Sequence, residues 1–449
     1  MSDLTPPPSV PAPPSAERRR FGSLRAFRHA DYSKIWAGAF LSNVGTWMEN
    51  IAVGVYVTET THQAGWTGTI AALMFLPAVV LAPIGGALAD RFDRRRYLFL
   101  GTLAQGVLAG LLAVLAYLHL LSLPAIAILM LLTGSASTLV SPGFSALLAE
   151  LVPPEDLLSA ISLSSAQYNL GRVVGPTLAA GVIAAGGFQT AFTFNACSFI
   201  AVLAAIYWMR PQAKVVGRRT LQLWSEIRAG IDVCRKDATI QLALGVTLAT
   251  AVLIAPFIGL VPAFAIKVFH GGAATTSLLV ASQGVGAVCA ALVTGGIAEA
   301  IGRGRMWGGS VALAAPLAAL YWLSPSLHVA VPAILVLGGV YLAMITGANT
   351  LCLSRVPTRV QARMSSIFSL VLGGGYSVGL VLMGWTGDRI GLHWVGAASA
   401  ALFAALVLAL RWKAPHAFDG IDADGHALSE ATTMTIPTMG GPAKVKPPR

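Results

Sequence analysis

Long apolar runs alternate with short polar connections along the whole chain. A run of about 20 mainly apolar residues can cross a bilayer as a helix. Only 11% of the 449 residues are charged, against about 25% in ordinary soluble proteins. The pattern therefore predicts an all-α membrane protein with twelve transmembrane helices. Their expected ranges are 35–58, 66–89, 97–118, 124–148, 159–184, 188–209, 239–265, 275–300, 307–324, 328–352, 362–386 and 391–412.

Basic residues gather in every second connection. With twelve spans and both termini on one side, 27 of the 30 Lys and Arg residues fall on one face of the membrane. Lys267 and Arg389 fall on the other face, and Arg172 lies inside a span. Because positive loops stay in the cytoplasm, we expect a multi-pass protein of a bacterial inner membrane with both termini cytoplasmic. The net charge of +11 then reflects topology and attraction to anionic lipid, and we expect no nucleic-acid partner.

Two similar segments lie about half a protein apart. Gly86–Arg96 and Gly295–Arg305 share a pattern of glycine, small residue, aliphatic residue, alanine and acid, and both end in arginine. A second pair follows at nearly the same offset, because Val-Pro at 152–153 recurs at 356–357. A repeat of this length in an apolar chain indicates two similar halves, an architecture that transporters use. We therefore expect two pseudo-symmetric six-helix bundles.

Polar segments divide the chain into five parts. We expect a disordered Pro/Arg-rich tail at 1–30 and a second disordered tail at 413–449. The two bundles are expected at 31–209 and 239–412. The connection at 210–238 places apolar residues at helical spacing, which predicts an amphipathic helix on the cytoplasmic surface; a plain tether is the alternative.

Signals of enzymes and of cofactor sites are missing from the sequence. It contains no Gly-Lys dipeptide, which excludes the Walker A loop of ATP-driven pumps. The eight histidines show no metal-ligand spacing, and the four cysteines form no Cys-x-x-Cys pair. We therefore expect no catalytic residues, no metal and no cofactor.

The segment from Gly86 to Arg95 resembles the loop between helices 2 and 3 of the major facilitator superfamily. Residues 43–48, 151–156 and 169–176 make the chain similar to one branch of that superfamily, the transmembrane secretion effectors, with enterobactin exporters and macrolide-efflux proteins. The likeness covers about residues 22–412. It implies the two-bundle fold and a monomeric transporter of a small molecule, with protons as the coupling ion.

The resemblance also assigns residues to a conformational latch. It implies that Asp90 faces the start of the eleventh helix, near Ala362, and that Asp90 and nearby arginines hold the halves together. Gly86 is expected to let two helices approach closely. The complete set expected at the latch and its second copy is Gly86, Asp90, Arg91, Arg94, Arg95, Glu299 and Arg303. The alternative is that the arginines only anchor the topology.

Gly171, Gly175 and Pro176 resemble the helix-5 motif that is common in exporters. Small residues four apart allow tight helix packing, and a proline inside a helix frees a carbonyl and bends the helix. Ala179-Ala180 stands where the family has a pair of glycines. The alternative is ordinary packing of two membrane helices.

Glu49 and Arg172 are the clearest charges within the predicted spans. Intramembrane charges are expensive and usually face a cavity or a partner. In the fold that the resemblance implies, spans 1 and 5 line the central cavity, so Glu49 is the candidate proton carrier and Arg172 the candidate that tunes it or holds an anionic substrate. A structural ion pair is the alternative. The further candidates for the cavity are Asn43, Asn50, Gln167, Asn169 and Gln283.

These features together predict a secondary transporter that works by alternating access. Its expected activity is proton-driven export of an amphipathic organic compound such as a siderophore or a drug. Two alternatives remain: an importer or facilitator of a small metabolite, and a non-transporting membrane receptor or scaffold.

Overall fold

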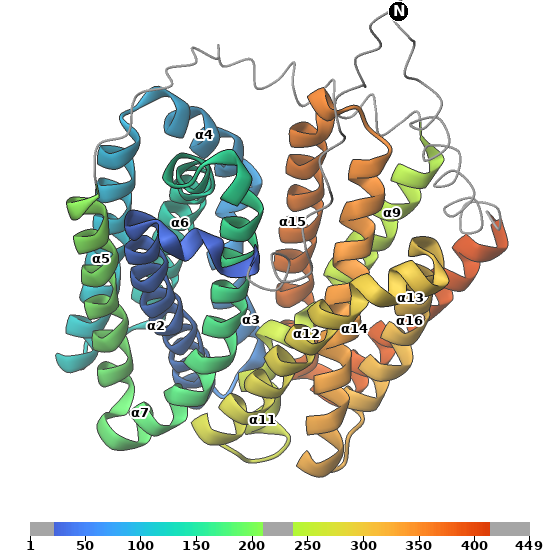
Figure 1. Ribbon diagram of the computed structural model, residues 1–449. Helices are drawn as coiled ribbons and strands as arrows, with labels where there is room; N and C mark the ends of the chain where they lie inside the picture. The colour runs from blue at the N-terminus through green and yellow to red at the C-terminus, as the bar shows by residue number, and fades with distance from the viewer. Residues whose placement is uncertain (1–21, 210–236, 414–449) are drawn as a thin grey trace, which may run out of the picture.

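Helices joined by short connections make up the part of the chain that the computed structural model describes, residues 22–209 and 237–413 (Figure 1). The first half contains η1 (Gly22–Arg28), α2 (Ala30–Thr61), α3 (Ala64–Phe75), α4 (Pro77–Arg91), α5 (Arg94–Tyr117), α6 (Leu123–Leu151), η2 (Pro154–Asp156) and α7 (Leu157–Trp208). The second half contains α9 (Ala238–Ala249), η3 (Thr250–Ile254), α10 (Pro256–Gly259), α11 (Val261–Lys267), α12 (Ala273–Ile301), α13 (Arg303–Trp322), α14 (Leu327–Ser354), α15 (Thr358–Ile390) and α16 (Leu392–Lys413).

Nine stretches of the described helices are long and apolar enough to cross a membrane. One of them, residues 154–208, contains two expected spans, which meet inside α7 at Gly187. The φ of 74° at Gly187 is a left-handed value that glycine adopts without steric penalty. The two remaining expected spans are also helical and correspond to α2 and α13. The all-α membrane fold is therefore confirmed.

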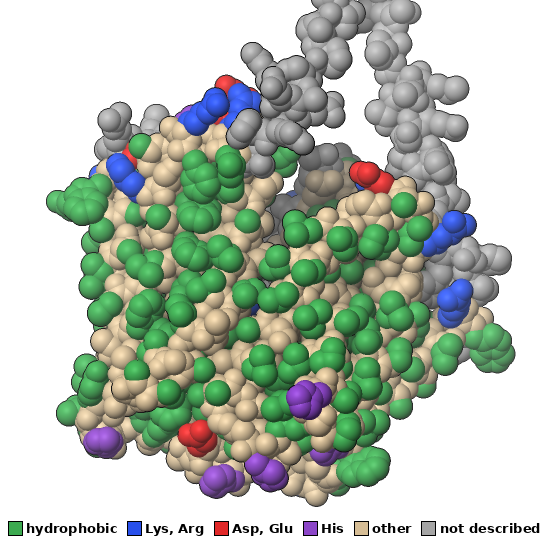
Figure 2. Space-filling view, turned by 60° about the horizontal axis from the view of Figure 1, so that its bottom comes forward, with side chains coloured by type: hydrophobic (Ala, Val, Ile, Leu, Met, Phe, Trp, Pro, Cys, Tyr) green, Lys and Arg blue, Asp and Glu red, His purple; other side chains and the backbone are tan. Residues whose placement is uncertain are grey.

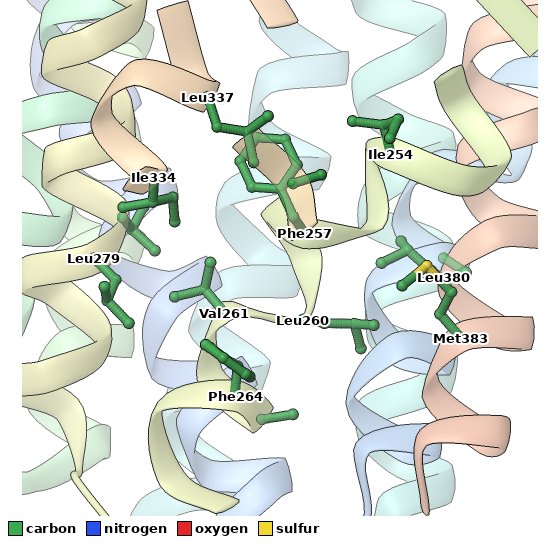
Figure 3. Packing of buried hydrophobic residues seen from close by; sticks show 14 of the residues in the cluster. Ile254, Phe257, Leu260, Val261, Phe264, Leu279, Ile334, Leu337, Leu380 and Met383 are labelled. Atoms are coloured by element: carbon green, nitrogen blue, oxygen red, sulfur yellow. The ribbon is translucent and has the colours of Figure 1, made fainter. Parts of the chain in front are cut away.

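The seventh expected span is broken into four pieces, although the sequence predicted one continuous helix at 239–265. The π-helical turn η3 follows α9, and Pro256 and Pro262 stand at the starts of α10 and α11. Proline has no backbone N–H to donate within a helix, so each proline interrupts the hydrogen-bond ladder. Figure 3 shows the buried side chains of this segment, including Phe257 and Phe264, between α12, α14 and α15.

The two ends of the bundles differ in charge. We call the end where α2 begins the terminal end, and the end where α2 passes into α3 the distal end. Figure 2 shows Lys and Arg side chains at the terminal end and His side chains at the distal end, with apolar side chains over the surface between them. This distribution is typical of a helical bundle whose middle faces lipid.

The described part of the chain begins at Gly22, and η1 is helical there, before the boundary expected at residue 30. The backbone N–H of Ala26 donates to Ser159 Oγ at 3.2 Å. Arg25 and His29 pair with the buried carboxylate of Asp156 at 3.2 and 2.9 Å. These contacts hold η1 against the start of α7. The expected tails outside 22–413 and the expected amphipathic helix at 210–238 lie outside the described residues, apart from the last two positions of that connection.

Candidate functional site

Glu49 lies inside the first half and hydrogen-bonds to a single asparagine. Its side chain is 2% exposed, and Asn195 Nδ2 donates to its Oε2 at 2.7 Å. The amide of Asn195 is itself positioned, because its Oδ1 accepts from Thr46 and from Ser198, both at 3.4 Å. Gly45 makes this contact possible: a Cβ there would lie 2.7 Å from Ser198 Oγ. The carboxyl group is thus held between α2 and the second segment of α7.

Arg172 stacks on an aromatic ring of its own half and interacts electrostatically with tyrosines of both halves. Its guanidinium stands over the Trp47 ring, 5.4 Å from the centroid, in the geometry of a cation–π contact. It interacts electrostatically with the phenol groups of Tyr168, Tyr341 and Tyr376. We call these five residues the Arg172 cluster. Tyr341 and Tyr376 belong to α14 and α15, so the cluster spans the boundary between the halves.

The Arg172 cluster contains an unused donor. The Nε of Arg172 is buried and has no hydrogen-bond partner among the described residues. A buried guanidinium N–H without an acceptor costs free energy, so the site is suited to an oxygen acceptor of a ligand.

Glu49 and Arg172 do not pair with each other. Among the described residues no ion pair joins them, and their contacts lie on different sides of α2. The structural ion pair that stood as the alternative to a cavity role is therefore not present among the described residues. The physical reason is helical rotation: Trp47 faces the cluster, whereas Glu49, two residues further on, points away from it by about 200°.

Of the five remaining cavity candidates, four lie in the first half and one, Gln283, lies in the second. Asn43 and Gln167 line a cavity in the first half, of about 340 Å³. Asn169 uses its amide to bond the Ser165 carbonyl at 2.8 Å on its own helix, and Asn50 is half-buried on α2. Gln283 is fully buried in α12, and its Nε2 has no partner among the described residues.

The expected latch residues at the terminal end contact other groups as well. Arg94 lies 2.7 Å from Glu150 and 3.9 Å from Asp90, so its closer partner is an acid that the sequence had not indicated. Arg95 donates to the carbonyls of Ile206 (3.1 Å) and Tyr207 at the end of α7. Arg91 is exposed.

The close helix approach expected at Gly86 lies one residue earlier. No described atom comes within 4 Å of a Cβ built at Gly86, whereas a Cβ at Gly85 would lie 2.9 Å from the Leu139 carbonyl oxygen. Gly85 therefore faces α6, and Gly86 lies on a different side of α4. In the second copy, Glu299 is exposed, and Arg303 lines a cavity of about 250 Å³ between α12, α13 and α14.

Small residues of the expected exporter motif pack α7 against α2. A Cβ at Gly171 would lie 2.9 Å from Asn43 Cβ, and one at Gly175 would lie 2.7 Å from the Val44 carbonyl oxygen. Pro176 is buried within α7. These contacts fix the position of Arg172, which lies between the two glycines on the same helix.

A contact at the distal end involves residues that no sequence motif indicates. Asp388, at the end of α15, accepts hydrogen bonds from the backbone N–H groups of Ala64 (2.8 Å) and Gly65 (2.7 Å) at the start of α3. Lys267 Nζ donates to the same carboxylate. We call these four residues the distal clasp. A carboxylate at a helix N-terminus accepts orphan N–H groups and faces the positive end of the helix dipole, so the clasp ties the halves together.

Packing beside the distal clasp is equally close. A Cβ at Gly68 would lie 2.3 Å from the Leu380 carbonyl oxygen, and Trp385 Nε1 donates to Thr69 Oγ1 at 3.2 Å. The helices α3 and α15 therefore meet backbone to backbone where the first half touches the second.

Two packed helical halves, with a cationic aromatic cluster at their boundary and a clasp at one end, define a membrane transporter of the major facilitator fold. The chain belongs to the transmembrane secretion effector family, whose model matches residues 21–446.

Several transporters are similar to this chain in sequence. The enterobactin exporter of Salmonella paratyphi A is 27% identical over 391 residues, 85% of this chain and 91% of the relative. Macrolide efflux protein A of Streptococcus pyogenes is 23% identical over 80% of this chain and 90% of its own length. The staphyloferrin A transporter of Staphylococcus aureus is 29% identical, but the match spans only 38% of this chain and 44% of the relative.

Solved structures match over almost their whole length. A bacterial homologue of the human lysosomal transporter Spinster, in an inward-facing and unoccupied conformation, superposes with a TM-score of 0.71 at 13% identity. The match covers 87% of this chain and 98% of that one. At this identity the likeness concerns the fold alone.

Proposed function

We propose that the protein exports an amphipathic organic molecule and is driven by protons moving inward. The observation that carries the proposal is Glu49, a carboxyl group buried in a membrane helix with one neutral hydrogen-bond partner. Ionisable groups inside membrane spans are expensive and are characteristic of proton pathways. Glu49 is then the proton-binding residue, and Asn195 positions it.

The Arg172 cluster is the proposed substrate contact. Its aromatic rings suit an apolar scaffold, and the free Nε of Arg172 suits an oxygen acceptor of the substrate. Both features favour a molecule with apolar and oxygen-bearing parts. The relatives named as exporters of enterobactin and as a macrolide efflux protein support export of such a compound.

The orientation follows from the basic residues. The terminal end carries the arginine-rich connections, so we infer that it faces the cytoplasm and that both termini lie there. The halves correspond to 31–209 and 239–412. The distal clasp ties α3 to α15 in this structure, so we infer that the transport cycle requires it to break. Asp90, Arg94 and Glu150 all belong to the first half and would gain or lose partners from the second half at the cytoplasmic end.

Transport into inverted membrane vesicles tests the proposal. Enterobactin and erythromycin are offered outside the vesicles, with and without an imposed pH gradient. We expect uptake that requires the gradient, is abolished by Glu49→Gln, and persists in the matched control Glu59→Gln, an exposed acid on the same helix.

Each other outcome assigns a different function. Gradient-driven uptake that survives in Glu49→Gln removes Glu49 as the proton-binding residue. Uptake without any need for a gradient indicates a facilitator. Failure of every compound in a wide panel to accumulate favours a receptor or scaffold.

A further inference from the structure

The first half contains a cavity that shares only one wall residue, Tyr168, with the Arg172 cluster. It measures about 340 Å³ and is lined by α2, α5, α6 and α7. We call it the first-half cavity. Its volume falls in the range of small-molecule sites, about 300–1,000 Å³. Tyr168 belongs both to its wall and to the Arg172 cluster, so the two features adjoin.

The first-half cavity contains two buried polar atoms without a partner. Gln167 is 6% exposed and Thr102 is 2% exposed, and both line the cavity from different helices. Among the described residues, neither Gln167 Nε2 nor Thr102 Oγ1 has a hydrogen-bond partner. A buried polar group that makes no hydrogen bond costs free energy. An oxygen atom of a ligand, presented to the amide N–H and the hydroxyl, would remove this cost.

The walls of the first-half cavity combine apolar surface with uncharged polar groups. None of its 20 lining residues is Asp, Glu, Lys, Arg or His. An ionised group placed there would lose its hydration without gaining a counter-ion, which is strongly unfavourable. Trp36, Phe144 and Phe199 supply flat apolar surfaces beside serine hydroxyls. The cavity therefore selects an uncharged, oxygen-rich group that also has apolar faces.

We propose that the first-half cavity binds the uncharged hydroxyl-, ester- or amide-bearing part of the transported molecule, through Gln167 and Thr102. The proposal rests on the transport function proposed above and specifies its substrate class. It excludes lipophilic cations as occupants of this cavity.

The first-half cavity is connected to Glu49 by two hydrogen bonds. Thr46 lines the cavity and donates to Asn195 Oδ1 at 3.4 Å, and Asn195 donates to Glu49 at 2.7 Å. A ligand oxygen that takes the Thr46 hydroxyl therefore changes the hydrogen bonding of the amide that positions Glu49. Substrate and proton sites would thus communicate within one rigid half.

Calorimetric titration of the full chain in lipid nanodiscs tests the substrate class. The uncharged probes are erythronolide B, a polyhydroxylated lactone, and iron-free enterobactin at pH 6; the cationic probe is tetraphenylphosphonium. We expect at least one uncharged probe to bind and its Kd to rise tenfold or more in Gln167→Leu and severalfold in Thr102→Val. Tetraphenylphosphonium should not compete with it.

Thr276→Val is the matched control. Thr276 is also a fully buried threonine whose hydroxyl has no hydrogen-bond partner among the described residues, but it lies in α12 outside the cavity, so the Kd should not change. The proposal is overturned if neither uncharged probe binds, if Gln167→Leu and Thr102→Val bind like the wild type, or if the cation competes. Binding needs no pH gradient, so these results are independent of whether Glu49→Gln abolishes transport.

Discussion

Replacing Asp388 by asparagine should release the distal clasp and open that end of the transporter. The carboxylate, 15% exposed, receives two backbone N–H groups of α3 and the ammonium group of Lys267. Asparagine keeps one acceptor oxygen, so it can serve only one of the two N–H groups. The NH₂ group of the asparagine then faces a donor, either a backbone N–H of α3 or the ammonium group of Lys267, and two donors that face each other repel.

The expected magnitude follows from the contacts that are lost. A hydrogen bond to a charged group contributes about 1.5–3 kcal/mol, and a charge at a helix N-terminus about 0.3–1 kcal/mol. We therefore expect the closed distal end to lose about 2–3 kcal/mol relative to the open one. Since about 1.4 kcal/mol corresponds to a factor of ten, the ratio of open to closed molecules should rise about 30- to 150-fold.

A cysteine at position 377 reports this change. Ser377 is 3% exposed and donates to the Ala72 carbonyl at 3.4 Å across the boundary of the halves. In a variant whose native cysteines are replaced by alanine, Ser377→Cys should react slowly with a membrane-impermeant maleimide added at the distal side. Asp388→Asn should raise the initial labelling rate at least tenfold.

Arg389→Gln is the matched control, because it alters the adjacent exposed charge without touching the clasp. Its labelling rate should equal that of the parent. A rate in Asp388→Asn within twofold of the parent, or an equal increase in Arg389→Gln, would refute the reasoning.

Three further changes have defined outcomes. Gly68→Val should keep α3 and α15 apart, because a Cβ at position 68 would lie 2.3 Å from the Leu380 carbonyl oxygen. It should therefore raise the labelling rate of the Ser377→Cys reporter without any change of charge. Asn195→Leu removes the hydrogen bond to Glu49 and should lower the unfolding free energy by about 1–3 kcal/mol, measured by thermal denaturation, together with loss of transport. Asp156→Asn should release η1 and cost about 1 kcal/mol, visible as faster proteolysis near residue 25.

The helices could be predicted from the sequence because apolar run length alone determines what can span a bilayer. Their interruptions were harder to predict. Pro256 and Pro262 lie inside an apolar run that is long enough for one span, and only the structure shows that both of them begin new helical segments. Gly187 falls between the expected spans 159–184 and 188–209, so a break was predicted there. In the structure this break is a single residue of positive φ within α7.

The contacts of the site required knowledge of helix rotation. Glu49 and Arg172 stood out in the sequence as intramembrane charges, yet their partners, Asn195 and Trp47, depend on which side of α2 each residue occupies. Asp388 was missed because an acid at a span end is common. Its importance comes from the start of α3, more than 300 residues away along the chain.

Separation of the two buried charges limits how a proton could drive transport. Glu49 contacts α7 of its own half, so its hydrogen bond to Asn195 is unaffected when the halves rock as rigid bodies. Arg172 interacts electrostatically with Tyr341 and Tyr376 of the other half, so the proposed rocking of the halves would change these interactions. In the proposed cycle, a proton at Glu49 would therefore act through the packing of α2, which carries Trp47 against Arg172. If this packing is stronger in one protonation state of Glu49, the equilibrium between the inward-open and outward-open arrangements changes. The proton then only has to bind with different free energy in the two arrangements.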